Sequence, residues 1–303
     1  MWIIYSLIAA FSRTIKDIGY KIILKDSDLW TSAFSIWVVT LIVLIPISIV
    51  IWRKSKKHLR TTNQKRYAIW GALSCGILNF IAYALFVYSL KNGDFSIVVP
   101  LRNLVPVFAL FLGAFILKEK VGLKVISAVM IVFIGIIIIH ISSETFSLKA
   151  LFNSITDKAS LAAFLCALVF SLTILTTKYG TGKEYGNMNS VIFITYVIAV
   201  MSLCFLLLIA IQGNLPIIAE LFKNHTQSLI FVGVLGAIGS ASTTAAIKVG
   251  ETIKVAPMLR VHALLSVVIG GLFFHESNLP IRIIGCLILT VGLIWIVFIK
   301  EKK

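Results

Sequence analysis

Long apolar runs alternate with short polar connections along the whole chain. Each run is 20 to 24 residues long, enough for a helix to cross the roughly 30 Å hydrocarbon core of a bilayer. Barrel strands would be about 10 residues long with alternating polarity, so the pattern predicts helices. The predicted segments span residues 2–24, 30–52, 67–90, 95–117, 121–141, 159–178, 190–211, 228–247, 252–274 and 280–299.

Most connections between these segments are only a few residues long, so we expect neighbouring helices to be antiparallel. None is long enough for a separate soluble domain. The sequence therefore predicts one all-α integral membrane domain with ten transmembrane helices. The longer connections are 53–66, 142–158, 179–189 and 212–227.

Composition supports this fold class. The chain has 303 residues, of which 59% are hydrophobic and 13% charged, whereas a soluble domain has about 45–50% apolar and about 25% charged residues. These values exclude a soluble globular protein and a disordered one. The four cysteines stand singly in apolar runs without metal-ligand or redox spacing, so we expect packing roles and neither a metal nor a cofactor.

The charge balance is strongly basic, with 28 Lys and Arg residues against 12 Asp and Glu residues. With a cytoplasmic N-terminus, seventeen of the basic residues fall in inside loops and seven in outside loops. This asymmetry predicts a multi-pass protein of the cytoplasmic membrane, plasma or inner, with both termini in the cytoplasm. The basic run Arg53 to Arg66 then lies at the anionic inner leaflet, which favours a lipid bilayer over a nucleic acid as its partner.

The chain also repeats itself. At an offset of 157 positions, Lys91-Asn92-Gly93-Asp94 lies over Lys248-Val249-Gly250-Glu251, and no gap is needed from 91 to 137. In the same register Pro100, Gly113, Glu119 and Gly135 lie over Pro257, Gly270, Glu276 and Gly292. Matching Gly, Pro and acidic positions indicate two five-helix halves, which we assign to 1–141 and 159–303, joined by an extracytoplasmic linker at 142–158.

Because five is odd, the second half enters the membrane from the opposite side. The predicted architecture is thus two inverted five-helix repeats, an arrangement typical of secondary transporters that work by alternating access.

The stretch from Lys91 to Glu119, with its ending Gly113-Ala114-Phe115-Ile116-Leu117-Lys118-Glu119, resembles the fourth helix of the drug/metabolite transporter superfamily, in its ten-helix EamA-type branch. Its copy, Pro257 to Glu276, resembles the ninth helix, and Gly135 and Gly292 fall where the following helix of this family carries a glycine. The resemblance covers essentially the whole chain. It implies transport of amino acids, metabolites, drugs or nucleotide-sugar-like compounds, often by proton coupling or exchange.

Charged residues inside the apolar segments are the main candidates for a substrate site, because a charge at membrane depth usually faces a cavity or a partner. In the first segment Arg13 and Asp17 are four residues apart and can neutralise each other, which leaves Lys16. A cationic surplus in a low-dielectric cavity favours an anionic or zwitterionic substrate.

The fourth and ninth segments supply further candidates, namely Arg102, Asn103, Arg260 and His262. Asn103 and Arg260 are repeat equivalents, and each follows a proline that loosens the backbone just before it. Irregular backbone at that depth needs burial or a water-filled cavity. We expect these side chains to line a central cavity, with helix capping as the alternative. His262 has two open roles, hydrogen bonding within the helix or coupling to a proton.

The remaining candidates are wall residues of the cavity. Asn79 and Tyr83 share one helix face four residues apart, and Trp37 lies in the second segment; aromatic packing is the alternative role. For Glu119 we expect a structural role, an ion pair with Lys118 or Lys120 at the cytoplasmic end.

The favoured function is a secondary transporter of a small anionic or zwitterionic organic metabolite, with a coupling proton and a homodimer left open. One alternative is a flippase for a lipid-linked headgroup, in which the cations would meet a phosphate. A second is an integral membrane enzyme, although no paired-carboxylate site or phosphate loop supports catalysis.

Overall fold

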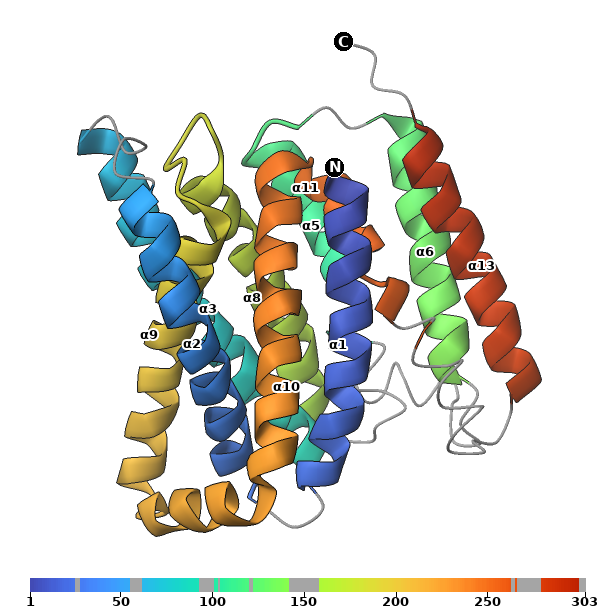
Figure 1. Cartoon of the computed structure of the whole chain (residues 1–303). Coiled ribbons are helices and arrows are strands. Elements are labelled where there is room, and N and C mark those ends of the chain that lie inside the picture. Colours follow the sequence, from blue (N-terminus) through green and yellow to red (C-terminus); the bar gives the residue numbers. More distant parts are fainter. Residues whose placement is uncertain are drawn as a thin grey trace. The chain divides into compact units, whose positions relative to one another are not determined.

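A computed structural model of the chain describes residues 1–24, 28–54, 62–92, 101–102, 104–119, 122–141, 158–262, 265 and 279–299. Over these residues the secondary structure is helical and contains no strand. The helices are α1 (Trp2–Leu24), α2 (Leu29–Lys54), α3 (Thr62–Asn92), α5 (Val105–Phe115), α6 (Leu123–Ile141), α8 (Lys158–Thr181), α9 (Ser190–Ile211), α10 (Leu215–Val249), α11 (Thr252–Met258) and α13 (Leu279–Phe298) (Figure 1).

The helices follow the apolar runs closely. Within the described residues, α2, α8, α9, α10 and most of α3 are long and apolar enough to cross a membrane, and α5, α6 and α13 contain shorter apolar stretches. The structure differs from the sequence prediction at 212–227, which we expected to be a connection. The chain is helical again from Leu215, and non-helical backbone at His225 divides α10 into two parts. Figure 1 shows the first part turned away from the direction of the rest.

The predicted fourth and ninth segments are both interrupted. In the fourth, a turn at Leu104 precedes α5. In the ninth, α11 ends at Met258, directly after Pro257, and a turn follows at Leu259 and Arg260. The irregular backbone expected after Pro257 is therefore present, and it places Arg260 at the break.

The chain divides into two compact units, and each combines helices from both halves of the sequence. The first unit consists of Met1–Phe80 and Thr176–Val249. The second consists of Ile81–Leu175 and Gly250–Lys303.

In the first unit α1 packs along α10, and α2 packs against both α9 and α10. Glycines of α10 allow the close approach, because a Cβ at Gly236 would lie 2.6 Å from the hydroxyl of Thr40. Buried residues of α1, α2 and α10 fill the space between the helices. They are Ile23, Ile36, Val39, Leu221, Leu229 and Val232.

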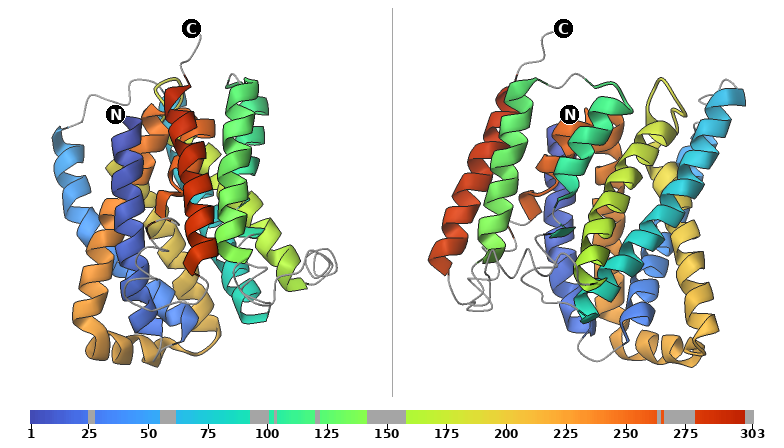
Figure 2. Two further views of the ribbon diagram at one scale, coloured as in Figure 1. Left: turned by 90° about the vertical axis from the view of Figure 1, so that its right-hand side faces the viewer. Right: turned by 180° about the vertical axis from the view of Figure 1, so that it is seen from behind.

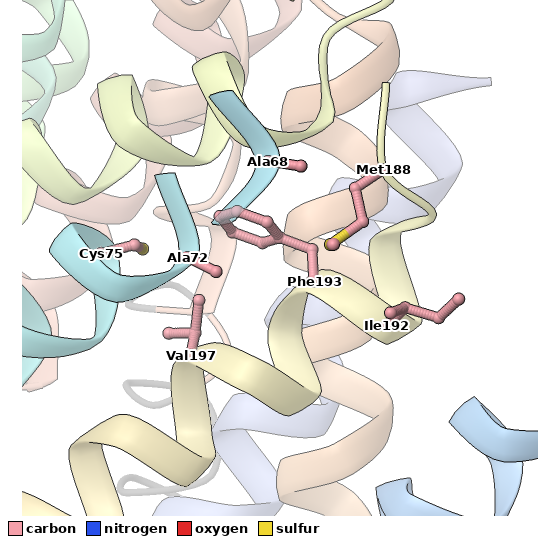
Figure 3. Packing of buried hydrophobic residues seen from close by; sticks show 7 residues of the cluster. All are labelled: Ala68, Ala72, Cys75, Met188, Ile192, Phe193 and Val197. Atoms are coloured by element: carbon pink, nitrogen blue, oxygen red, sulfur yellow. The ribbon is translucent and has the colours of Figure 1, made fainter. Parts of the chain in front are cut away.

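A second apolar cluster joins α3 to α9 and to the loop that precedes α9 (Figure 3). The ring of Phe193 lies against Ala68 and Ala72 of α3. It fits there because Gly180 of α8 has no side chain to occupy that space. This packing fixes the loop 182–189 beside the first turns of α3.

In the second unit α6 packs along α13, and α5 packs against α11 (Figure 2). The contact between α6 and α13 is reciprocal. A Cβ at Gly135 would lie 2.5 Å from the backbone nitrogen of Leu289, and one at Gly292 would lie 2.8 Å from that of Val132. Gly135 and Gly292 are equivalent at the repeat offset, and so are Val132 and Leu289.

Candidate functional site

Arg102 lies in the second unit, just before α5, with its guanidinium against aromatic rings. Its Cζ is 3.8 Å from the ring centroid of Phe86 and 5.6 Å from that of Phe170. Phe170 also makes an edge-to-face contact with Tyr83, whose ring centroid is 5.5 Å away. Aromatic faces attract a cation electrostatically, so these rings hold the charge in the apolar segment without neutralising it.

Arg260 and His262 follow the end of α11 in the same unit. The backbone N–H of Arg260 donates to the carbonyl of Pro257 at 2.8 Å, which closes the turn. Nδ1 of His262 donates to the carbonyl of Leu259, also at 2.8 Å. Both side chains are half-buried. The local hydrogen bond of His262 fits the first of the two roles open to it and orients the imidazole.

Arg102 and Arg260 both lie in the second unit, within electrostatic range of Cys166 of α8. Cys166 of α8 is fully buried, and the positive charges of Arg102 and Arg260 both act on its thiol. Two guanidinium groups from different apolar segments therefore lie within electrostatic range of one point. Arg102, Arg260, Phe86, Phe170 and Cys166 are called the arginine cluster below.

The first unit holds the candidates from α1, α2 and the first part of α3. The Nζ atom of Lys16 lies 5.1 Å from the ring centroid of Trp37, and the side chain of Arg13 passes beside Gly239 of α10. The amide of Asn79 donates to the carbonyl of Cys75 at 2.9 Å and to its Sγ at 3.4 Å. These residues thus have partners within their unit.

Two candidates fall outside what the structure describes. Asn103 is not among the described residues, and neither is the side chain of Asp17. The expected neutralisation of Arg13 by Asp17 therefore stays a prediction, as does the role of Asn103.

Glu119 has a structural role of a kind that the sequence analysis did not predict, and the expected ion pair with Lys120 lies outside the described residues. Its carboxylate accepts hydrogen bonds from the backbone N–H groups of Thr252 and Ile253, at 2.8 and 3.1 Å. Glu119, which follows α5, thereby provides hydrogen-bond acceptors for the first backbone N–H groups of α11, which have none within their own helix. Lys254 on the same turn is buried and pairs with Glu251 at 3.2 Å. The partners of Glu119 are distant in the sequence, so no local pattern identified them.

The sequence analysis also missed a basic pocket in the first unit. It has a volume of about 1100 Å³. Three of its lining residues are lysines that the sequence analysis used only to orient the chain in the membrane. We define the basic pocket by its lining residues: Trp52, Lys65, Ile69, Ala72, Leu73, Lys183, Asn187, Met188, Asn189, Ile192, Tyr196, Val200 and Lys248.

Helices of this length and apolarity, with half-buried arginines in two of the apolar segments, indicate a multi-pass membrane protein. The model of the EamA-like transporter family matches residues 1–141 and 157–298. The chain belongs to this family, as the resemblance of its fourth and ninth segments implied.

Two curated relatives cover nearly the full chain. An uncharacterized transporter of Archaeoglobus fulgidus is 23% identical over 274 residues, which are 90% of this chain and 90% of the relative. An uncharacterized transporter of Clostridium kluyveri is 23% identical over 305 residues, 99% of this chain and 94% of the relative. Both names support a transporter, and neither states a substrate.

A solved structure described only as "Crystal structure of protein" has a similar fold. It aligns with a TM-score of 0.70 at 11% identity, and the alignment covers 97% of this chain and 95% of the other. At this identity the likeness concerns the fold alone.

Proposed function

We propose that this protein is a secondary transporter that moves a small anionic or zwitterionic organic metabolite across the cytoplasmic membrane by alternating access. The observation that carries the proposal is the arginine cluster: the guanidinium of Arg102 lies 3.8 Å from the ring centroid of Phe86, and Arg260 lies at the break after α11 in the same unit. Membership of the EamA-like family supplies the transporter class. The charge of the cluster supplies the class of substrate.

The chemistry of the cluster favours a carboxylate or phosphate. A guanidinium is planar, stays charged and can donate two parallel hydrogen bonds to such a group. In an apolar, low-dielectric setting its attraction for an anion is stronger than in water. Phe86 and Phe170 add apolar surface beside Arg102, which suits an organic molecule better than an inorganic ion.

Alternating access is supported by the way equivalent segments of the two halves pair. α2 packs against α9, α5 against α11 and α6 against α13. Each pair joins two segments that are equivalent at the repeat offset. The reciprocal contacts of Gly135 and Gly292 follow the same rule. These pairings support two inverted repeats, which can exchange conformations and open one site to either side in turn.

Uptake into proteoliposomes tests the function. The purified protein is reconstituted and offered radiolabelled carboxylates, amino acids and phosphate esters, with and without a pH gradient that reports coupling to protons. We expect uptake of at least one anionic or zwitterionic compound. If folded protein moves none of the panel, or moves only cations, the proposal is wrong.

Variants of the arginine cluster then test the site. Arg260→Ala and Arg102→Ala should each lower the uptake rate by about tenfold or more. Each variant loses a hydrogen bond between charged groups, and the free energy of such a bond corresponds to a change of this size. Arg260→Lys should retain part of the activity, because the positive charge remains while the planar guanidinium with its two parallel donors is lost. Arg53→Ala, at an exposed position at the end of α2, is the control and should transport at the wild-type rate.

A further inference from the structure

The basic pocket has a polar end and an apolar end, and its lining comes from separate parts of the chain that meet within the first unit. Trp52 lies at the end of α2, Lys65 lies in the first turn of α3, and Lys248 lies in the last turn of α10. The loop 182–189 supplies Lys183 and its neighbours. Three of these places are helix ends and the fourth is a loop between two helices, so the polar end of the pocket belongs at the membrane surface.

The polar end is held in place by hydrogen bonds. Nζ of Lys248 donates to the carbonyl of Met188 at 2.8 Å, and Nζ of Lys178 donates to that of Ile247 at 3.1 Å. The side chain of Asn189 accepts from the backbone N–H of Val191 and caps α9. These bonds fix the loop to α10 and α9, so the lysines surround a preformed space.

The charge at this end is unbalanced. Among the described residues that line the pocket, none is acidic. Lys183 and Lys248 line the same pocket, so their like charges repel each other. Glu184 follows Lys183 in the chain but is exposed and does not line the pocket. The start of α9 adds the positive end of a helix dipole. An anion that binds here would relieve the repulsion.

Deeper in the pocket the lining is apolar. Ile69 and Leu73 follow Lys65 along one side of α3, and Ile192, Tyr196 and Val200 follow one another along α9. At 1.5 Å per residue, Val200 lies about 15 Å from the start of α9. Ile69 and Tyr196 are more than half exposed. Exposed apolar side chains at this depth of a membrane protein face acyl chains.

We propose that the basic pocket binds an anionic phospholipid, with the phosphate on Lys65, Lys183 and Lys248 and an acyl chain along the apolar faces of α3 and α9. A molecule with charge at one end and a long apolar part matches the order of the lining residues. A soluble anion would leave the apolar part of the 1100 Å³ empty. Basic pockets between helices on the cytoplasmic side bind anionic headgroups in other membrane proteins. The lipid is a bound ligand of the first unit and not the cargo of the arginine cluster.

Lipid binding to the purified protein tests the proposal without any transport assay. Native mass spectrometry measures binding of long-chain phosphatidylglycerol, phosphatidylcholine, short-chain phosphatidylglycerol and glycerol 3-phosphate. We expect the long-chain anionic lipid to bind most tightly. The double variant Lys65→Gln/Lys183→Gln changes two exposed residues and should weaken that binding by about tenfold or more.

The control is Lys54→Gln/Arg66→Gln. It removes the same charge from exposed positions at the end of α2 and the start of α3, outside the pocket lining, and should bind the lipid as the wild type does. Equal losses in both double variants would overturn the proposal, because general surface charge would explain the binding. If phosphatidylcholine binds as tightly as long-chain phosphatidylglycerol, the lysines do not select an anionic headgroup and the proposal is wrong. Equal binding of glycerol 3-phosphate or of the short-chain lipid would assign the pocket to a soluble anion.

Discussion

Glu119 illustrates how one side chain can join two segments that are distant in the sequence. Its carboxylate binds the first backbone N–H groups of α11, and Gly113 leaves room for it, since a Cβ there would lie 2.9 Å from Oε2 of Glu119. The chain reaches this position through Lys118, whose φ of 54° lies in the left-handed region. The break beside Arg260 is therefore anchored at its N-terminal side by Glu119.

Replacing Glu119 should destabilise the second unit. Glu119→Ala leaves two backbone N–H groups without their acceptor and should cost about 1–2 kcal/mol, the range for a lost N-terminal cap. Glu119→Gln keeps one acceptor oxygen and should cost less. Thermal unfolding in detergent measures both. Glu184→Ala, at an exposed position, is the control; a midpoint for Glu119→Ala equal to that control would contradict the capping role.

At the same scale, the sequence singled out Arg102 and Arg260 as candidates but gave no sign of the basic pocket. Arg102 and Arg260 were identifiable because a cation inside an apolar segment is costly and rare. Lys65, Lys183 and Lys248 lie at helix ends, where lysine is ordinary. Only the fold shows that they surround one space.

Among the elements, the sequence predicted most helix boundaries closely, because apolar runs and helices coincide in a membrane. α1 and α9 begin and end where the hydrophobic pattern does. The first part of α10 was missed because Glu220, Lys223, Asn224 and His225 make that stretch polar. Its apolar residues, 215–219 and 221–222 with the buried Leu221, form a run too short to cross a membrane.

The packing of α6 on α13 leads to a prediction about two equivalent glycines. Gly135→Ala and Gly292→Ala would each place a Cβ within 3 Å of the partner's backbone. The helices must then separate, at a cost of about 1–3 kcal/mol. Because the contacts are reciprocal, the two losses should be similar in size.

The matched control is Gly122→Ala. A Cβ at Gly122 would have no neighbour within 4 Å, so this change should leave the unfolding midpoint unchanged. Thermal unfolding of the three variants checks the comparison. If Gly135→Ala is as stable as Gly122→Ala, α6 and α13 do not pack as described.

For the whole molecule, the distribution of basic residues predicts the orientation in the membrane. The loop with Lys183 and the polar stretch with Lys223 lie at opposite ends of α9, about 33 Å apart for 22 residues. The excess of Lys and Arg on the side of Lys183 predicts that this side is cytoplasmic. Both lysines are exposed.

Cysteine labelling tests this orientation. Lys223→Cys should react with an impermeant maleimide added to intact cells, and Lys183→Cys only after the membrane is permeabilised. The native cysteines provide a low background, since Cys75, Cys166 and Cys286 are buried and Cys204 is half-buried. The opposite labelling pattern would invert the topology and place the basic pocket outside the cell.

The reciprocal contact of α6 with α13 also bears on how such a chain can originate. Gly135 meets Leu289, and Gly292 meets Val132, the equivalent of Leu289. This is the geometry of an isologous interface, in which two identical subunits present the same surface to each other. A surface of this kind needs no covalent link between its two sides. Under the proposed arrangement of two inverted repeats, a gene that encoded only one five-helix half would already carry both faces of this contact, and fusing two copies would make permanent a pairing that the separate subunits could form.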